Sequence, residues 1–304
     1  MFSKKQKAEP GQLGNIRPKT GQSSTRQPVT ASLSPLQTNA PKVPSHLRSK
    51  MHRALSAYPR WVLEPSPSKA EQRERTEKTG LHGPSQLPSQ RALDALKPDQ
   101  KVSVSIQKDR IAFLPKTPKK QGMIIYPGAM VDFQSYAAMA RQFAERGYTT
   151  VIAHMPHNMI LVGSQKADSI IQEFPAVKAW AIAGHSLGGA MAQKYITGKP
   201  DPKVKGVAFW ASFPFVDLSQ KKMEMVFIQG SNDNLFGKHI FYDFQRLMPK
   251  DTPVIELKGG NHSQFGDYGL QFPDLAATMS RKEQQKAIVD ITTAMLSRMK
   301  PHSS

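Results

Sequence analysis

Residues 177–197 read VKAWAIAGHSLGGAMAQKYIT, and this stretch decides the fold. An apolar run, Val177 to Ala183, leads directly into Gly184-His185-Ser186-Leu187-Gly188-Gly189 and then into a segment rich in Ala and Met. The first run is typical of a buried strand and the last of a packed helix. A Gly-x-Ser-x-Gly motif between strand and helix places its serine on a sharp turn, with the hydroxyl projecting from the sheet. We therefore interpret Ser186 as a candidate nucleophile, against the alternative of a turn that only starts a helix.

The sequence on both sides of this motif predicts an α/β domain over residues 93–304. Short apolar runs alternate with amphipathic segments, as in a mostly parallel sheet with helices on both faces. The predicted strands are 102–106 and 110–114, an antiparallel edge pair, followed by 123–126, 150–155, 177–183, 204–211, 225–229 and 254–257. The predicted helices are 133–146, which Asp132 caps and Gly147 ends, then 166–173, 187–197, 240–247 and one that starts near Ser280.

Two details of this domain bear on its core and on its active site. Strands 204–211 and 225–229 are joined by a short connection, so we expect no cap domain and a shallow, open site above the eight-stranded sheet. The last helix opens with a capping box, Ser280 to Glu283. Its buried face is predicted as Ala287, Ile288, Ile291, Ala294 and Met295, and the strand aromatics Trp180, Phe209 and Trp210 are expected in the core.

Residues 1–92 are predicted to be a disordered basic extension. Half of the 24 prolines lie before residue 100, and the first 60 residues hold 11 basic residues and one acidic residue. Such a tail favours weak contact with an anionic membrane or polyanion, or is merely solvated. Within it, residues 46–58 have the spacing of a short basic amphipathic helix.

The composition also restricts the cellular setting. The chain has no cysteine, so disulfides and thiolate chemistry are excluded. No apolar run is long enough for a transmembrane segment, and no secretory signal is present. We expect a cytoplasmic protein, with organelle import through the basic N-terminus as the alternative.

A serine nucleophile needs a base, and that base needs an orienting acid. In folds built around this turn, the acid and then the histidine follow the serine. Four of the nine histidines lie in the polar leader or the C-terminal tail, three precede Ser186, and His239 falls in a predicted helix. His262 follows the last predicted strand in a Gly-Gly-Asn-His-Ser loop, where it is either the base or a histidine that binds backbone.

The acid is predicted from the strand that ends at Gln229. Asp233 follows this strand in Gly230-Ser231-Asn232-Asp233, at the sheet edge where the serine and histidine also emerge. A turn-forming aspartate is the alternative. Asp217 and Asp267 are the other candidates.

Backbone donors for an oxyanion are predicted on two segments. One is the N–H of Leu187, directly after the serine, and the other is the N–H of Ala129 in Pro127-Gly128-Ala129-Met130, with Gly128 letting the substrate approach. We expect His185, Gln264 and Phe265 to contact the substrate as well, although Gln264 and Phe265, with Asp267 and Tyr268, would equally serve to pack their loop.

These motifs together resemble a known family. Tyr126-Pro127-Gly128, Met155-Pro156-His157-Asn158, the segment around Ser186 and the segment Gly260 to Gly269 look like the small, capless α/β-hydrolases related to the dienelactone-hydrolase branch. The resemblance runs from about residue 93 to the end and implies a serine hydrolase with Ser186, Asp233 and His262 as its triad. Dienelactone hydrolases use a cysteine nucleophile, so the resemblance does not imply their reaction.

The sequence hypothesis is therefore a serine hydrolase that cleaves a small-molecule carboxylic ester or thioester through an acyl-serine intermediate. No metal-ligand spacing and no phosphate-binding glycine loop is present, so we expect no cofactor. The alternative is a catalytically silent binding or scaffold protein of the same fold, with its basic tail docking on an anionic membrane or polyanion.

Overall fold

The computed structural model describes residues 86–155, 165–235 and 244–301. Most of the predicted extension, including the helix at 46–58, lies outside these residues, as does the first half of the predicted helix at 240–247, whose end forms a short 3₁₀ helix, η2 (Gln245–Leu247). A short helix, α4 (Gln90–Ala95), spans the predicted start of the domain.

Eight strands form one sheet in the order β1-β2-β4-β3-β5-β6-β7-β8. The strands are β1 (Val102–Gln107), β2 (Arg110–Pro115), β3 (Gln121–Tyr126), β4 (Thr149–Ala153), β5 (Ala179–His185), β6 (Val204–Trp210), β7 (Glu224–Gly230) and β8 (Val254–Leu257). β2 runs antiparallel to β1 and β4, and every other neighbouring pair is parallel. The predicted eight-stranded, mostly parallel sheet with an antiparallel edge pair is confirmed.

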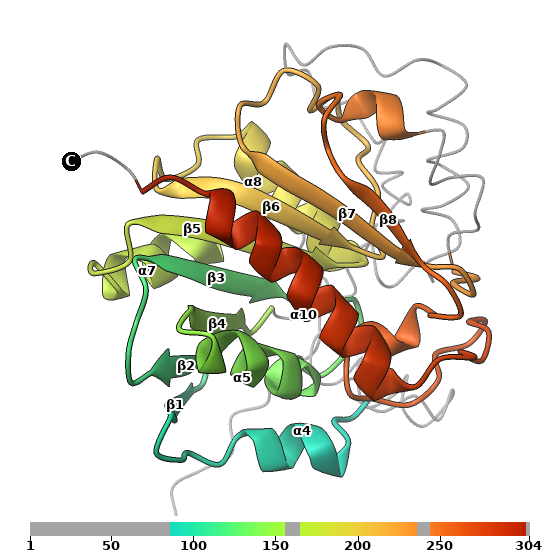
Figure 1. Cartoon of the computed structure of the whole chain (residues 1–304), viewed down its shortest axis with the longest axis horizontal. Coiled ribbons are helices and arrows are strands. Elements are labelled where there is room, and N and C mark those ends of the chain that lie inside the picture. The colour runs from blue at the N-terminus through green and yellow to red at the C-terminus, as the bar shows by residue number, and fades with distance from the viewer. Residues whose placement is uncertain (1–85, 156–164, 236–243, 302–304) are drawn as a thin grey trace, which may run out of the picture. The chain divides into compact units, whose positions relative to one another are not determined.

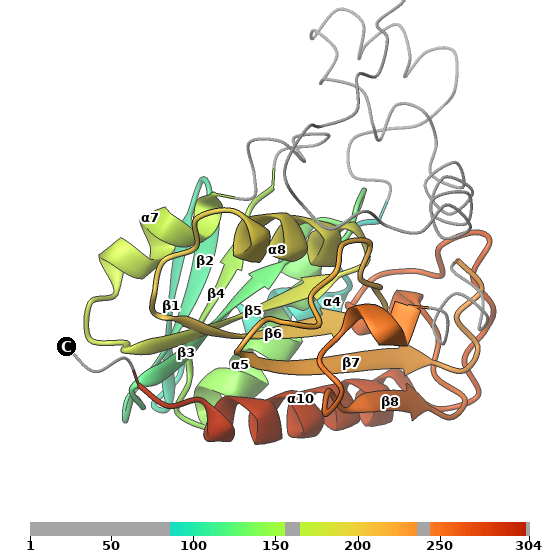
Figure 2. The ribbon, with the colours of Figure 1, turned by 90° about the horizontal axis from the view of Figure 1, so that it is seen from above.

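Helices cover both faces of the sheet (Figures 1 and 2). One face carries α5 (Ala137–Glu145) and α10 (Arg281–Arg298), and the other carries α7 (Lys166–Glu173) and α8 (Leu187–Thr197). Alternate residues of each strand enter different cores: Met123 and Ile125 pack with α5, whereas Ile124 and Tyr126 pack with α8. The aromatics predicted in the core, Trp180, Phe209 and Trp210, are fully buried.

The segment after β3 begins its helix as predicted. Asp132 caps it, since its carboxylate accepts the Gln134 N–H at 2.8 Å. The first turn, η1 (Phe133–Tyr136), is a 3₁₀ helix that continues into α5. Gly147 follows the helix with φ +90°, a conformation that favours glycine and stops the helix.

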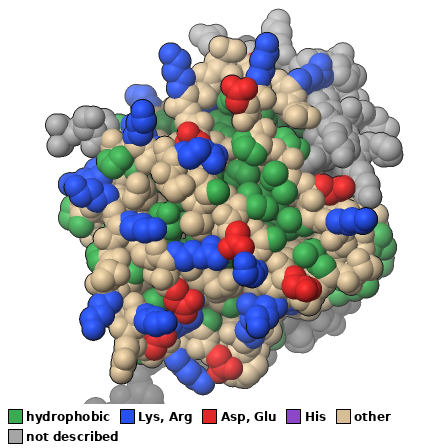
Figure 3. Space-filling model, in the orientation of Figure 1, with side chains coloured by type: hydrophobic (Ala, Val, Ile, Leu, Met, Phe, Trp, Pro, Cys, Tyr) green, Lys and Arg blue, Asp and Glu red, His purple; other side chains and the backbone are tan. Residues whose placement is uncertain are grey.

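The closing helix α10 has the predicted capping box, but its buried face is turned from the predicted one. Ile288 and Met295 are buried as expected, whereas Ala287 and Ile291 are half-buried and Ala294 is exposed. The buried stripe instead contains Gln284, Gln285, Val289, Thr292 and Leu296. The polar residues of this stripe are buried because they bind neighbouring loops and side chains. Thr292, for example, accepts the Trp210 indole N–H on its Oγ1 at 3.1 Å. Figure 3 shows the outer surface of the molecule on the side where α10 lies, with apolar side chains among scattered basic and acidic ones.

The connections leave no room for a cap in the expected place. β6 and β7 are joined by residues 211–223 without a helix, so no cap domain is inserted there. Within the described ranges, no helix has the length and apolarity that crossing a bilayer requires.

Candidate active site

Ser186 stands on a strained turn at the carboxyl end of β5. Its backbone has φ 53° and ψ −120°, an unfavourable region for a residue with a side chain, and α8 begins at the next residue. Glycine is required beside it: a Cβ on Gly188 would lie 2.1 Å from the Tyr126 carbonyl oxygen, and one on Gly184 would lie 2.4 Å from Gly189 Cα. The close approach of strand and helix therefore fixes the turn that projects the serine.

Asp233 and His262 form a buried pair on the loops after β7 and β8. His262 Nδ1 lies 2.8 Å from Asp233 Oδ2, and both side chains are fully buried. The other carboxylate oxygen accepts the Leu235 N–H at 3.0 Å. A carboxylate at Nδ1 holds the neutral ring with its proton on that nitrogen, which leaves Nε2 as the basic atom.

Backbone N–H groups of both loops bind the two loops to each other. The Asn232 N–H donates to the Gly260 carbonyl at 2.7 Å, and the Gly259 N–H donates to Ser231 Oγ at 2.8 Å. A Cβ on Gly230 would lie 2.4 Å from the Gly260 oxygen, so glycine permits this approach. The relative position of acid and base is therefore set by backbone contacts.

Two further side chains fix the loop that carries His262. The buried Gln284 amide of α10 binds the Asn261 backbone twice, as acceptor at 3.0 Å and as donor at 2.7 Å. On the other side of the histidine, Asp274 accepts from both the N–H and the hydroxyl of Ser263, at 2.8 and 2.6 Å. His262 thus lies between two anchored neighbours.

His185 connects the serine turn to the histidine loop. Its ring centroid lies 4.6 Å from that of His262 and 5.4 Å from that of Phe265, with which it is nearly parallel. Because His185 directly precedes Ser186, these contacts bring the serine turn beside His262. The structure thus brings the three residues of the predicted triad to one end of the sheet.

Tyr136 ties His185 to the loop after β3. Its hydroxyl accepts the Gly128 N–H at 2.9 Å and lies 2.7 Å from His185 Nδ1. Burial lowers the pKa of His185 well below its usual value, and the neighbouring His262 lowers it further, so the ring is neutral. The phenol oxygen thus contacts both the Gly128 N–H and the His185 ring. The loop, the tyrosine and the residue before Ser186 form one buried network.

The two predicted oxyanion donors lie on segments that meet at this turn. Leu187 is the first residue of α8, where backbone N–H groups have no partner within the helix. The Gly128 N–H is occupied by Tyr136, whereas no hydrogen bond within the described residues takes up the Ala129 N–H. Gly128 is confined by the network, since a Cβ there would lie 2.8 Å from His185 Nδ1.

A cavity of about 250 Å³ begins at Gly128. Its lining is mostly apolar and comprises Pro127, Gly128, Met130, Val131, Asp132, Phe133, His154 and Met155. Of the residues predicted to contact substrate, only Gly128 is among them. His185 and Phe265 are fully buried, and the Gln264 N–H donates to Asn261 Oδ1 at 3.0 Å. Their contact with substrate stays a prediction.

The site is more enclosed than the short β6–β7 connection predicts. Ser186 is 5% exposed and His262 is fully buried, and Phe265 of the histidine loop stacks on His185 beside the serine turn. The other two candidate acids lie elsewhere: Asp217 accepts the Ser219 N–H in a local turn, and Asp267 pairs with Arg91 at 2.7 Å.

Sequence reasoning missed Tyr136, Asp274 and Gln284. The pattern places Tyr136 only within the predicted helix at 133–146, which says nothing of its hydroxyl. The one available signal was that a fully buried tyrosine hydroxyl needs a hydrogen-bond partner.

Comparisons with known proteins agree with this architecture. A family model described as "Alpha/beta hydrolase family" matches residues 122–286, which is 165 of the 304 residues. No curated protein matches the chain.

Solved structures that resemble the chain include TT1662 from Thermus thermophilus, at 12% identity and a TM-score of 0.48 over 65% of this chain and 99% of that one. A putative alpha/beta hydrolase from Agrobacterium tumefaciens matches at 16% identity and a TM-score of 0.48, over 66% and 100% of the two chains. Esterase 2 from Thermogutta terrifontis, in its apo form, matches at 12% and 0.47, over 67% and 98%.

Proposed function

Because the chain belongs to the alpha/beta hydrolase family, we propose that it is a serine hydrolase that cleaves carboxylic esters or thioesters through an acyl-Ser186 intermediate. The observation that carries the proposal is the fully buried Asp233–His262 pair, 2.8 Å apart, beside the strained turn of Ser186. A buried histidine with a carboxylate on Nδ1 is a base whose Nε2 is kept ready to accept a proton.

In the first half of the reaction, His262 Nε2 takes the proton of the Ser186 hydroxyl as the oxygen attacks the carbonyl carbon of the substrate. The carbonyl oxygen becomes an oxyanion, which accepts hydrogen bonds from the N–H groups of Leu187 and Ala129. Each such donor contributes about 3 kcal/mol to the transition state. The intermediate collapses as the bond to the leaving alcohol or thiol breaks, and His262 returns its proton to that leaving group.

In the second half, water replaces the leaving group. His262 takes a proton from the water as its oxygen attacks the acyl carbon, and the bond to Ser186 then breaks with return of that proton to the serine. Asp233 stays ionised throughout and stabilises the imidazolium that forms twice in each cycle. The acyl group leaves as a carboxylic acid.

The cavity beside Gly128 is the proposed place for one arm of the ester. Met130, Val131, Phe133 and Met155 give it apolar walls, while the stacked Phe133 and His154 rings, 4.5 Å apart, close one side. Burying an apolar group there is favourable by about 25 cal/mol for each Å² removed from water. We therefore expect esters with a short apolar acyl or alkyl arm to be preferred over charged ones.

A fluorophosphonate probe tests the proposal, because it reacts with an activated serine hydroxyl. We expect one site of labelling, at Ser186, and loss of both labelling and turnover of p-nitrophenyl esters in Ser186→Ala. Ser169→Ala, at an exposed position on α7, is the matched control and should label as the wild type does. Labelling that persists in a folded Ser186→Ala variant would exclude this serine as the nucleophile.

A further inference from the structure

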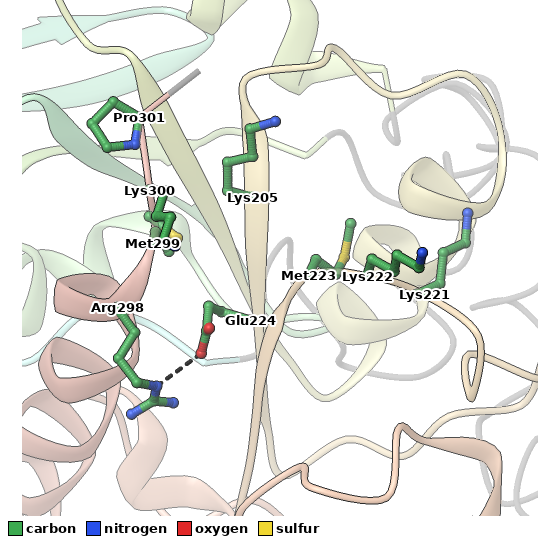
Figure 4. A pocket seen from close by; sticks show the side chains of 9 residues that line it. All are labelled: Lys205, Lys221, Lys222, Met223, Glu224, Arg298, Met299, Lys300 and Pro301. Carbon is green, nitrogen blue, oxygen red and sulfur yellow. Dashed lines mark hydrogen bonds and ion pairs between the residues drawn. The ribbon is translucent and has the colours of Figure 1, made fainter. Parts of the chain in front are cut away.

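A second cleft, of about 440 Å³, lies at the opposite end of the sheet from Ser186. Three segments line it, namely the starts of β6 and β7 and the end of α10 (Figure 4). The lining residues are Lys205, Lys221, Lys222, Met223, Glu224, Arg298, Met299, Lys300 and Pro301. Since β6 ends at Trp210, beside His185, the cleft lies about 17 Å along the strands from the serine turn.

The wall formed by residues 298–301 is fixed in place. The Arg298 Nε donates to Glu224 Oε2 at 2.8 Å, and the Met299 carbonyl accepts from the Gln121 side chain at 3.3 Å. Met299 itself is buried against Gly206, where a Cβ would lie 2.8 Å from its sulfur. The cleft is therefore a defined feature of the domain, built where the C-terminal segment crosses two strands.

Its charge is strongly unbalanced. Five cations and one carboxylate line it, a net of +4, and the carboxylate of Glu224 is already paired with Arg298. Lys221 donates to the Ile196 carbonyl at 2.8 Å. Lys205, Lys222 and Lys300 have no side-chain hydrogen bond or ion pair within the described residues. An anion that enters the cleft would reduce the repulsion among these like charges.

Further lysines extend this positive region along the N-terminal ends of the neighbouring strands. The Lys178 N–H donates to the Lys120 carbonyl and the Trp180 N–H to the Lys203 carbonyl, each at 2.7 Å, which places three lysines at the starts of adjacent strands. A row of like charges raises the local concentration of anions and speeds their capture. The cleft lies at one end of this row.

We propose that the cleft binds a compact, multiply phosphorylated anion, with its phosphates on Lys205, Lys222 and Lys300. A phosphate monoester carries close to two charges at neutral pH, so each group neutralises more than one ammonium, which a carboxylate does not. Met223 and Met299 offer apolar contact to its carbon skeleton. The cleft volume favours a compact ligand over a nucleic acid strand. This inference is independent of the role of Ser186.

Calorimetric titration of the full chain with inositol hexakisphosphate tests it. Lys205→Ala/Lys222→Ala/Lys300→Ala should weaken the affinity at least tenfold. The matched control is Lys101→Ala/Lys108→Ala/Lys282→Ala, three exposed lysines outside the cleft, which removes the same charge and leaves the basic leader unchanged. The control should stay within twofold of the wild type. The proposal is overturned if both triple variants lose affinity equally, or if neither variant loses affinity.

Further titrations identify the source of the phosphates and the competing class of partner. Vesicles with a multiply phosphorylated inositol lipid, compared with phosphatidylserine vesicles of equal charge, test the lipid source. Binding to the free phosphate alone supports a soluble ligand, and binding to both forms supports a lipid headgroup, provided that the cleft variant loses each. Single-stranded RNA that binds tightly, loses affinity in the cleft variant and is not displaced by inositol hexakisphosphate would contradict a compact ligand.

Discussion

Replacement of Tyr136 by Phe removes one oxygen that joins the oxyanion loop to the residue before Ser186. The change leaves the Gly128 N–H and His185 Nδ1, 2.9 and 2.7 Å from that oxygen, without a partner in a fully buried place. A buried polar group left unsatisfied costs about 1–3 kcal/mol. For two such groups, with some relaxation of the loop, we expect a loss of about 2–4 kcal/mol in the free energy of unfolding.

The effect on activity follows from the position of the loop. Ala129, which carries the proposed second oxyanion donor, is next to Gly128, so release of Gly128 moves that donor. Complete loss of one donor costs about 10² to 10³ in kcat. A displaced donor should therefore lower kcat by about tenfold to a hundredfold, with little change in KM because the donor binds mainly the transition state.

The assay measures kcat and KM on a p-nitrophenyl ester together with denaturant unfolding. Tyr148→Phe is the matched control, because Tyr148 is buried and its hydroxyl makes no hydrogen bond within the described residues. The control should keep both activity and stability. The reasoning is refuted if Tyr136→Phe is destabilised as expected but turns over with a kcat within twofold of the wild type.

Three further outcomes are expected. Asp233→Asn should lower kcat by about 10³ to 10⁴ with KM nearly unchanged, because the wrong tautomer of His262 is favoured; steady-state kinetics measures this, and a tenfold loss or less would argue against the pair. Since the folded-state pKa of His185 lies well below 6.5, the unfolded chain binds more protons below pH 6.5, so this group should remove stability as the pH falls, by up to about 1.4 kcal/mol per pH unit. Urea unfolding at pH 7 and pH 5 checks it, and an equally steep loss in His185→Gln would contradict it. Gly188→Ala should destabilise the fold by more than about 3 kcal/mol, since its Cβ would overlap the Tyr126 oxygen at 2.1 Å, whereas Gly198→Ala, with its nearest atoms at 3.5 Å, should be tolerated in thermal melts.

The elements that carry local signals could be predicted from the sequence. Apolar runs locate all eight strands, and the Gly-x-Ser-x-Gly motif locates Ser186 at the end of one of them, because the required close approach leaves glycine as the only fit. Because the strands before Asp233 and His262 run parallel to the strand before Ser186, their following loops lie at the same end of the sheet. These two residues could therefore be predicted to lie near the serine.

The contacts that hold these residues in place could not be predicted. Tyr136 meets His185 across 49 positions of the chain, and Gln284 meets Asn261 from another element, so no local spacing reports either bond. The buried face of α10 was predicted wrongly for the same reason. A glutamine that is buried because it binds backbone of another element cannot be told from a surface glutamine in the sequence. Asp233 could be ranked above Asp217 and Asp267 by its place after β7, but only the fold shows that Asp267 is paired with Arg91.

Acylation of Ser186 during turnover is the central claim, and pre-steady-state kinetics with p-nitrophenyl acetate tests it most directly. We expect a burst of about one equivalent of p-nitrophenolate per enzyme, and acid quenching within the burst should trap the acetyl group on the peptide that contains Ser186. His262→Ala should abolish the burst. Steady turnover with no burst and no acetylated peptide under conditions where deacylation is slowed, or an acetyl group on another residue, would contradict the account.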